Sequence, residues 1–189
     1  MIARIARLAA LPLVAPVLVF SLMLALPASA QPRKPGAAAH TAATAGSGPK
    51  SIGRFEDWTA ATHQESGQTV CYAFTRAQSS TPALPSRGAV ILTVTERASG
   101  RDTVAIEAGF SYAANAAVSV QVDQTGLEFY TDKRNAFARD GHATVTAFGK
   151  GSRAIARSPG PKDTAVTDTF SLKDFAAAYA AIVKACPAK

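Results

Sequence analysis

Cysteine, histidine and tryptophan are scarce in this chain, whose 189 residues include only two, three and one of them respectively. Two cysteines exclude a zinc site held by four thiolates. With 48% hydrophobic and 17% charged residues, the composition also excludes collagen-like, coiled-coil and wholly disordered chains. The length suits one globular domain rather than two.

Signature motifs of catalysis are absent as well. The chain has no Gly-x-Ser-x-Gly nucleophile elbow and no His-Glu-x-x-His zinc motif, and Gly149-Lys150-Gly151-Ser152 lacks the upstream glycine of a phosphate-binding loop. Helix-turn-helix, RNP-like and zinc-finger spacings are also missing, so we expect no nucleic-acid partner. We therefore predict no catalytic residue, no cofactor and no bound metal.

Residues 1–30 are predicted to be a signal peptide. Arg4 and Arg7 precede an apolar run of 19 residues, 8–26, and Ala28-Ser29-Ala30 supplies the small alternate residues of a signal-peptidase site. The run is near the length that spans a bilayer, so an uncleaved anchor is the alternative. Two prolines in the run and the Ala-Ser-Ala site favour cleavage after Ala30, which would leave no membrane span.

Residues 31–51 consist mainly of Ala, Gly, Pro, Thr and Ser, with no acidic residue and no large apolar side chain. Such a segment cannot build a core, so we predict a disordered linker followed by a folded domain over residues 52–189. Residues 1–51 also contain five of the 20 basic residues and none of the 13 acidic ones, so the net charge of +7 falls to +2 in the domain. The basic composition therefore gives no argument for nucleic-acid binding.

Cys71 and Cys186 are predicted to form a disulfide, because both lie in the domain that we expect to be exported into an oxidising compartment. One alternative is a redox-active pair, which usually has the Cys-x-x-Cys spacing absent here. The other is a metal site formed with His63 and His142.

Alternating apolar residues predict a mainly β domain. The turns between the strands recur every eight to twelve residues without repeated strand-helix alternation, so we expect antiparallel layers and favour a sandwich over a partly closed barrel. Ser158-Pro159-Gly160-Pro161 is expected to interrupt the ladder between the last two strands. The predicted strands cover residues 68–76, 90–94, 104–108, 118–122, 127–131, 153–157 and 165–170.

Two helices are expected. Residues 141–148 contain β-branched residues, but Asp140 and Gly149 are suitable caps and favour a short helix. The C-terminal helix is predicted to be capped by Ser171, with Asp174 in its first turn. Its apolar stripe should pack on the sheet and bring Cys186 to Cys71; the stripe comprises Leu172, Phe175, Tyr179, Ile182 and Cys186.

Several polar residues are candidates for function. Four basic residues within a short acid-free stretch or just beyond it form a candidate strip for anionic polymers, although such a run is commonly only a solvated strand. They are Lys150, Arg153, Arg157 and Lys162. Asp168 shares a strand face with Val166 and Phe170, so an inward Asp168 would need donors or a cation; we expect a structural hydrogen-bonding role.

The aromatic residues Trp58, Tyr72 and Phe74 are predicted to be core, with a binding role for Trp58 as the alternative. We expect His63 and His142 to be ordinary surface residues rather than catalytic bases.

The order of several segments is distinctive. They are Phe55-Glu56-Asp57-Trp58, Gly67-Gln68-Thr69-Val70-Cys71-Tyr72-Ala73, Ala108-Gly109-Phe110-Ser111-Tyr112, Gly149-Lys150-Gly151-Ser152, and Thr167-Asp168-Thr169-Phe170-Ser171-Leu172 before the helix with Cys186. This set resembles the invasion-associated locus B family of bacterial envelope proteins. Glu56 and Asp174 stand where the family often has glycine, and Phe137 where it usually has tryptophan. The resemblance implies a periplasmic or surface-associated protein with no established enzymatic activity or cofactor.

We therefore expect an exported protein, periplasmic, outer-membrane associated or secreted, that acts as a non-enzymatic binding or structural module in host-cell interaction or envelope maintenance. Its partner would be an unidentified envelope or host-surface component. The alternative is an exported hydrolase or isomerase with an unrecognised site. That alternative requires Asp140, His142 and Asp168 to converge within hydrogen-bond reach.

Overall fold

The structure is a computed structural model and describes residues 48–188. The predicted signal peptide and residues 31–47 of the predicted linker lie outside the described residues. The first strand begins at Lys50, so the last two residues assigned to the linker, Lys50 and Ser51, are part of a strand.

Eleven strands, two α-helices and a short 3-10 turn make up the described chain. In order they are β1 (Lys50–Phe55), β2 (Trp58–Glu65), β3 (Gln68–Arg76), β4 (Ser79–Thr81), β5 (Ile91–Arg97), β6 (Gly100–Glu107), β7 (Ala117–Val122), β8 (Thr125–Asp132), β9 (Asn135–Ala138), α1 (Gly141–Lys150), β10 (Arg153–Pro159), the turn Pro161–Asp163, β11 (Ala165–Ser171) and α2 (Phe175–Ala185).

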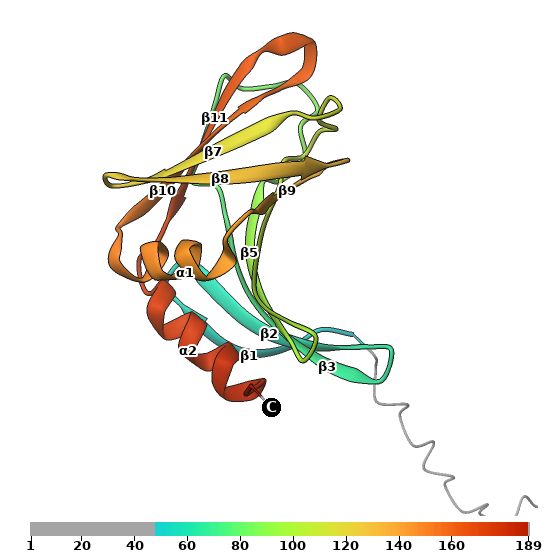
Figure 1. The fold of residues 1–189 in the computed structure, drawn as a ribbon, viewed down its shortest axis with the longest axis vertical. Coiled ribbons are helices and arrows are strands. Elements are labelled where there is room, and N and C mark those ends of the chain that lie inside the picture. Colours follow the sequence, from blue (N-terminus) through green and yellow to red (C-terminus); the bar gives the residue numbers. More distant parts are fainter. Residues whose placement is uncertain (1–47, 189) are drawn as a thin grey trace, which may run out of the picture. The chain divides into compact units, whose positions relative to one another are not determined.

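All strand pairs are antiparallel, and they form one sheet in the order β1-β2-β3-β5-β6-β9-β8-β7-β10-β11-β4. The sheet bends strongly, so that the layer of β7, β8, β10 and β11 lies apart from the layer of β1–β3, with both helices on the inner side (Figure 1). The predictions of a mainly β antiparallel domain and of a C-terminal helix packed on it are confirmed. The layers are parts of one continuous sheet.

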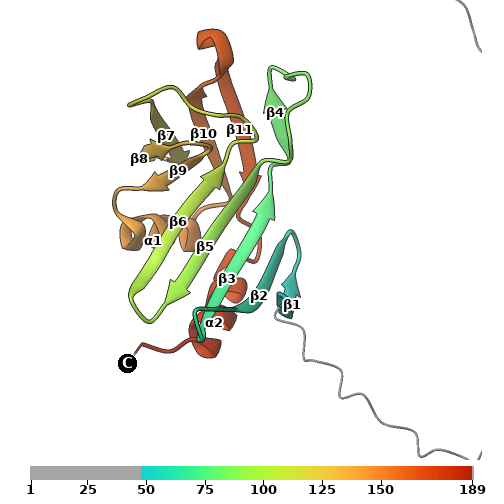
Figure 2. The same ribbon diagram turned by 90° about the vertical axis from the view of Figure 1, so that its right-hand side faces the viewer.

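The two ends of the bent sheet are linked through β3 and β4. These strands are separated only by Ala77 and Gln78; β3 pairs with β5, whereas β4 pairs with β11 (Figure 2). At the break, Ala77 N–H donates to the Val90 carbonyl (2.9 Å) and Gln78 N–H to the Thr169 carbonyl (2.8 Å). The chain thus crosses from one layer to the other while the N–H groups of Ala77 and Gln78 both keep a backbone hydrogen-bond acceptor.

The core lies between the inner face of the sheet and the two helices. Trp58 is fully buried, donates from Nε1 to the Ser171 carbonyl (3.1 Å) and packs edge-on against Phe175, with ring centroids 4.9 Å apart. Trp58 is therefore core, as predicted. The other large, fully buried aromatic residues are Phe129, Phe148, Phe170 and Phe175.

The prediction that Tyr72 and Phe74 are core is wrong. The buried face of β3 carries Cys71, Ala73 and Thr75, whereas Tyr72 and Phe74 lie half-exposed on the outer face. The physical reason is the close approach of α2, which packs on the inner face of β2 and β3. Small side chains there leave room for the helix, and aromatic rings would not.

Both helices are present, but α1 ends later than predicted, with Gly149 inside the helix and Gly151 as its C-cap, and α2 starts later than predicted. In α1, the Asp140 carboxylate accepts from Ala143 N–H (2.9 Å), as expected of its N-cap. The predicted cap of the second helix, Ser171, is instead the last residue of β11 and pairs with Arg153. The helix begins at Phe175 after Asp174, which has φ 59°. Its predicted apolar stripe does face the core.

The predicted interruption between the last strands is also shorter than expected. Ser158 and Pro159 continue the ladder opposite Val166 and Ala165, because proline at a strand end can still occupy a ladder position. The break begins at Gly160.

Candidate functional site

The disulfide prediction is confirmed: Cys71 on β3 is bonded to Cys186, which directly follows α2, with Cα atoms 5.9 Å apart. Both sulfurs are in the bond, so neither supplies a thiolate to a metal site with His63 and His142. The bond closes a loop over a sequence separation of 115. A closure of that length stabilises a fold by about 2–5 kcal/mol.

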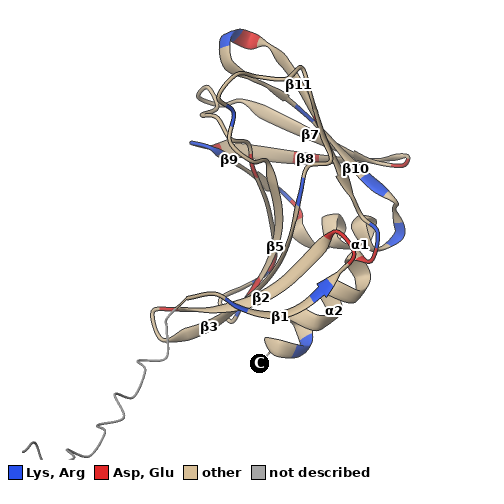
Figure 3. Ribbon diagram, turned by 180° about the vertical axis from the view of Figure 1, so that it is seen from behind, with Lys and Arg blue, Asp and Glu red and all other residues tan. Residues whose placement is uncertain are grey.

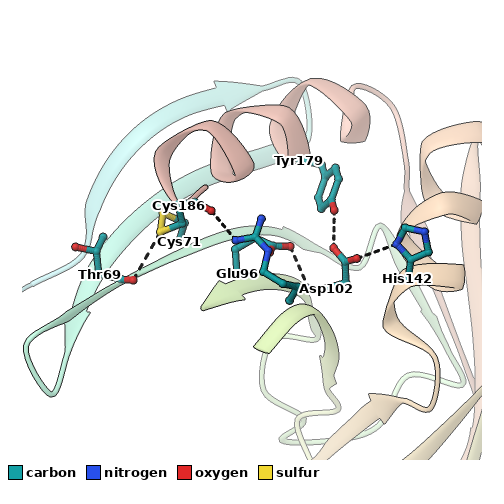
Figure 4. Close-up of polar contacts among 8 residues, drawn as sticks. Thr69, Cys71, Glu96, Asp102, His142, Tyr179 and Cys186 are labelled. Atoms are coloured by element: carbon teal, nitrogen blue, oxygen red, sulfur yellow. Dashed lines mark hydrogen bonds and ion pairs between the residues drawn. A yellow bond between two sulfur atoms is a disulfide. The ribbon is translucent and has the colours of Figure 1, made fainter. Parts of the chain in front are cut away.

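A polar network lies beside the disulfide and connects four elements (Figure 4). Arg101 donates from Nη1 to the Cys186 carbonyl (2.6 Å), and its Nε lies 2.6 Å from Glu96 Oε2. The N–H of Asp102 donates to Glu96 Oε1 (3.2 Å). Asp102 in turn accepts from the Tyr179 hydroxyl and lies 3.1 Å from Nδ1 of His142. The network therefore joins β5 and β6 to α1 and α2.

Local sequence explains how these side chains meet. Glu96 follows Leu92 and Val94 in the inward positions of β5 and is fully buried with them. Gly141 lets the start of α1 approach β6, because a Cβ there would overlap the carbonyl oxygen of Asp102. This contact places His142 next to the Asp102 carboxylate.

Burial raises the pKa of Glu96 to about 7, and a hydrogen bond and the negative charge of Asp102 act in the same direction. The Asp102 N–H and the Arg101 charge oppose the rise. Burial would also raise the pKa of Asp102, but its hydrogen bonds with Tyr179, His142 and Glu96 outweigh burial and lower it. Burial and the Asp102 carboxylate raise the pKa of Tyr179.

This network links both helices to the sheet through side-chain contacts. The side chain of His142 is 83% exposed. The Asp102 carboxylate that it contacts also accepts a hydrogen bond from the Tyr179 hydroxyl. A raised pKa keeps the Tyr179 hydroxyl protonated, so it supplies no nucleophile. Its chemical effect is to fasten α1 and α2 to β6.

The three residues that the hydrolase or isomerase alternative requires do not converge. Asp140 caps α1, His142 contacts Asp102, and Asp168 is held by Arg87 and Ser80. Each is engaged in a separate structural contact, so the arrangement does not support that alternative.

Asp168 faces inward from β11 and is almost fully buried. Its carboxylate accepts from Nη1 and Nη2 of Arg87 (both 2.8 Å) and from the Ser80 hydroxyl (2.6 Å). Arg87 also donates from Nε to the Ala108 carbonyl (2.7 Å) and lies over the Phe110 ring at 4.9 Å. These contacts fasten the loop after β4 to β11. Sequence reasoning did not identify Arg87.

The four residues of the predicted basic strip lie at three places. Arg153 and Arg157 are exposed on the outer face of β10, and Lys150 precedes them at the end of α1. Lys162 lies apart, in the turn beyond β10, next to Asp163. Figure 3 shows the cations of β10 and the mixed charges of that turn.

The outer face around Arg153 and Arg157 contains no acid on the neighbouring strands β7 and β11. Arg157 is flanked by Ser119 and Thr167, and Ile155 by Gln121 and Thr169. Glu128 on β8 lies opposite Ser119, two strands from Arg157, and Asp123, in the turn directly after β7, follows the residue that pairs with Ala154. We call Lys150, Arg153 and Arg157 with these uncharged neighbours the cationic face.

Comparison with known proteins assigns the family. The family model described as Invasion associated locus B (IalB) protein matches residues 58–183. The chain belongs to the IalB family. A crystal structure of invasion associated protein B from Bartonella henselae is similar, with a TM-score of 0.53, 16% identity, and coverage of 70% of this chain and 95% of that chain. At this identity the similarity supports a common fold. No curated protein is significantly similar to the chain in sequence.

Within residues 48–188, no helix has the length and apolar character needed to cross a membrane. In the same part of the chain, no group of three or more His, Cys, Asp or Glu side chains is arranged to hold a metal ion.

The outer face of the IalB domain also has an aromatic groove of about 530 Å³ over β2, β3, β5 and β6. Its rings are those of Tyr72, Phe74 and His63; Tyr72 and Phe74 are stacked with centroids 6.0 Å apart, and His63 meets Tyr72 edge-on at 5.4 Å. Pro49, Ile91 and Glu107 also line the groove. We call this surface the aromatic groove.

Proposed function

We propose that this IalB-family protein is an exported cell-envelope protein that works as a non-enzymatic binding module. Its cationic face would bind an anionic polymer of the envelope or of a host surface. The observation that carries the proposal is the pair of exposed arginines on a sheet face where the adjacent strands β7 and β11 have no acidic side chain.

The geometry of the cationic face suits a repeating anionic ligand. Arg153 and Arg157 are four residues apart on one strand and point to the same side, so their attachment points are about 13 Å apart. At that spacing they contact separate anionic groups rather than sharing one. The hydroxyl and amide side chains of Ser119, Gln121 and Thr167 can donate hydrogen bonds to the same ligand.

The disulfide and the N-terminal sequence support export. A disulfide between distant cysteines is typical of proteins that fold in oxidising compartments. Residues 1–30 have the basic start, apolar run and small-residue site of a signal peptide. Family membership agrees with an envelope location.

Charge reversal tests the proposal. The variant Arg153→Glu/Arg157→Glu is compared with the native protein for retention on heparin and on anionic envelope fractions. Each cation near an anionic surface contributes about 1 kcal/mol, so loss of the two cations alone weakens binding by about 30-fold, and repulsion by the two new carboxylates weakens it further.

The matched control is Arg134→Glu/Lys184→Glu, which changes the net charge equally at exposed positions outside the cationic face. Retention of the control should stay within a few-fold of native. If the Arg153/Arg157 variant binds as tightly as this control, the cationic face is not the binding surface.

A further inference from the structure

We propose that the aromatic groove and a pocket beside it together bind an acidic sugar unit of a polysaccharide. The pocket has a volume of about 470 Å³, and we call it the arginine pocket because Arg54 and Arg76 line it. Phe74 lines both hollows, so the two adjoin. They lie over β1, β2, β3, β5 and β6, which are neighbours in the sheet, rather than over β10 (Figure 2). The proposal therefore does not depend on the cationic face.

Strand register places the two arginines on either side of the Phe74 ring. Phe74 on β3 pairs with Thr59 on β2, which in turn pairs with Arg54 on β1. Directly paired residues of antiparallel strands point to the same face, so these three side chains form a row across the sheet. Arg76 follows Phe74 by two residues and points to that face as well. Two guanidinium groups thus approach the arginine pocket from different strands.

Charge favours an anion in the arginine pocket. Arg54 and Arg76 are both exposed, and neither has an ion-pair partner within residues 48–188. Asp57 also lines the pocket, and its carboxylate accepts from Nε2 of Gln78 (3.4 Å). Two guanidinium groups beside one carboxylate leave the pocket with net positive charge. Planar guanidinium groups bind a carboxylate through pairs of N–H donors, so an acidic group suits this end of the surface.

The aromatic groove provides a surface on which a sugar ring can pack. One face of a pyranose ring carries C–H groups, which pack on the negative face of an aromatic ring, while its hydroxyls point outward. Tyr72 and Phe74 are half-exposed, with ring centroids 6.0 Å apart. On β5, Thr95 pairs with Tyr72 and Thr93 with Phe74, and both threonines line the groove. Hydroxyl groups that both donate and accept therefore lie beside the aromatic rings.

Glu107 gives the surface a direction. Glu107 on β6 pairs with Ile91 on β5, which pairs with Arg76 on β3, so carboxylate and guanidinium flank Ile91 in one row. Glu107 is exposed and, in the part of the chain that the structure describes, has no ion-pair partner. A free carboxylate accepts hydrogen bonds from sugar hydroxyls but repels another acid. A polysaccharide in which acidic and neutral sugars alternate therefore fits better than one with an acid on every sugar.

The test is a two-dimensional NMR titration of the full exported protein with oligosaccharides of hyaluronan, in which glucuronate alternates with uncharged N-acetylglucosamine. The same oligosaccharides with their carboxyl groups reduced to alcohols are the matched ligand. The acidic form should shift the backbone amides of Thr93 and Thr95 and leave that of Ile155 on β10 in place. It should bind at least about tenfold more tightly than the reduced form, because only the acid bonds to the guanidinium groups.

Two variants separate the parts of the surface. Arg76→Gln should weaken binding of the acidic form by about tenfold and that of the reduced form by less than about twofold. Phe74→Ala should weaken binding of both forms by about tenfold, because it removes the apolar surface under the sugar ring. The matched controls Arg134→Gln and Tyr130→Ala change exposed residues outside both hollows and should keep both affinities within about twofold of native.

Three results would overturn the proposal. The first is a titration that leaves the amides of Thr93 and Thr95 in place or shifts only amides of β10, which would assign the oligosaccharide to the cationic face. The second is an equal loss of both forms in Arg76→Gln, as expected if this arginine only supports the fold. The third is an oligoglutamate peptide that shifts the same amides at lower concentration, which would assign the surface to an acidic protein segment. Arg153→Glu/Arg157→Glu should leave the titration unchanged.

Discussion

Replacing Glu96 by glutamine should remove a large part of the pH dependence of stability. Glu96 is fully buried beside Arg101 and Asp102, and its pKa rises from an ordinary value of 4.5 to about 7. A difference of that size between the folded and unfolded states corresponds to about 3 kcal/mol.

The sign follows from the direction of the shift. Because the folded-state pKa lies above the unfolded value, the stabilising contribution is complete below about pH 4.5 and is lost as the pH rises through 7. The lowered pKa of Asp102 has the opposite effect, but only as the pH falls towards its ordinary value of 3.8 and below. Between pH 5 and 8, the free energy of unfolding of the native protein should therefore decrease by about 2–3 kcal/mol through Glu96.

Urea denaturation at several pH values between 5 and 8 measures this effect. Glu96→Gln should flatten the decrease, while Glu128→Gln, at an exposed position of β8, should retain the native slope. Equal slopes in native protein and Glu96→Gln would refute the reasoning, as would a native protein that becomes more stable from pH 5 to pH 8.

Three further substitutions probe the contacts that hold the fold. Cys71→Ala/Cys186→Ala should lower the free energy of unfolding by about 2–5 kcal/mol in denaturant titrations, and an unchanged midpoint would contradict the disulfide's role. Arg87→Met should lower the free energy of unfolding by about 3–5 kcal/mol, because it leaves the buried Asp168 carboxylate without its cation. The double variant Arg87→Met/Asp168→Leu should recover much of that loss. A double variant no more stable than Arg87→Met would argue against a stabilising role for the ion pair. His142→Ala should change stability by less than about 1 kcal/mol, since its ring is largely exposed, and a larger loss by calorimetry would give the histidine a role beyond its surface contact with Asp102.

The strands of this protein can be predicted from its sequence because apolar and polar side chains alternate along them. Alternation gives the period of a strand but not which face is buried, and β3 shows the consequence. If Cys71 meets the inner side of α2, Tyr72 and Phe74 must point away from it. The disulfide prediction and the prediction of core aromatics are both met only if a second layer covers the face of β3 opposite α2, and in the structure that face lies on the outside of the sheet.

The polar network was partly visible in the sequence. Glu96 continues the inward series of Leu92 and Val94, so alternation alone places a carboxylate in the core and demands partners for it. The identity of those partners was not predictable, because Asp102, His142 and Tyr179 come from three different elements. Their meeting depends on how α1 and α2 pack, which local patterns do not determine.

The loop residue Arg87 illustrates the same limit. Alternation along β11 predicts that the Asp168 side chain points inward. A buried carboxylate needs a cation or hydrogen-bond donors beside it, so such a partner is expected. Loop residues have no periodicity, so nothing in the sequence distinguishes Arg87 from the other arginines. Likewise, the basic strip was predicted as four residues in sequence, but the turn after β10 separates Lys162 from the other three.

The intact mass of the protein recovered from its own bacterium directly tests both export and the disulfide between Cys71 and Cys186. We predict the mass of residues 31–189 less two hydrogen atoms, in the envelope fraction, with no thiol available to a maleimide. A full-length chain with two reactive thiols would contradict the account.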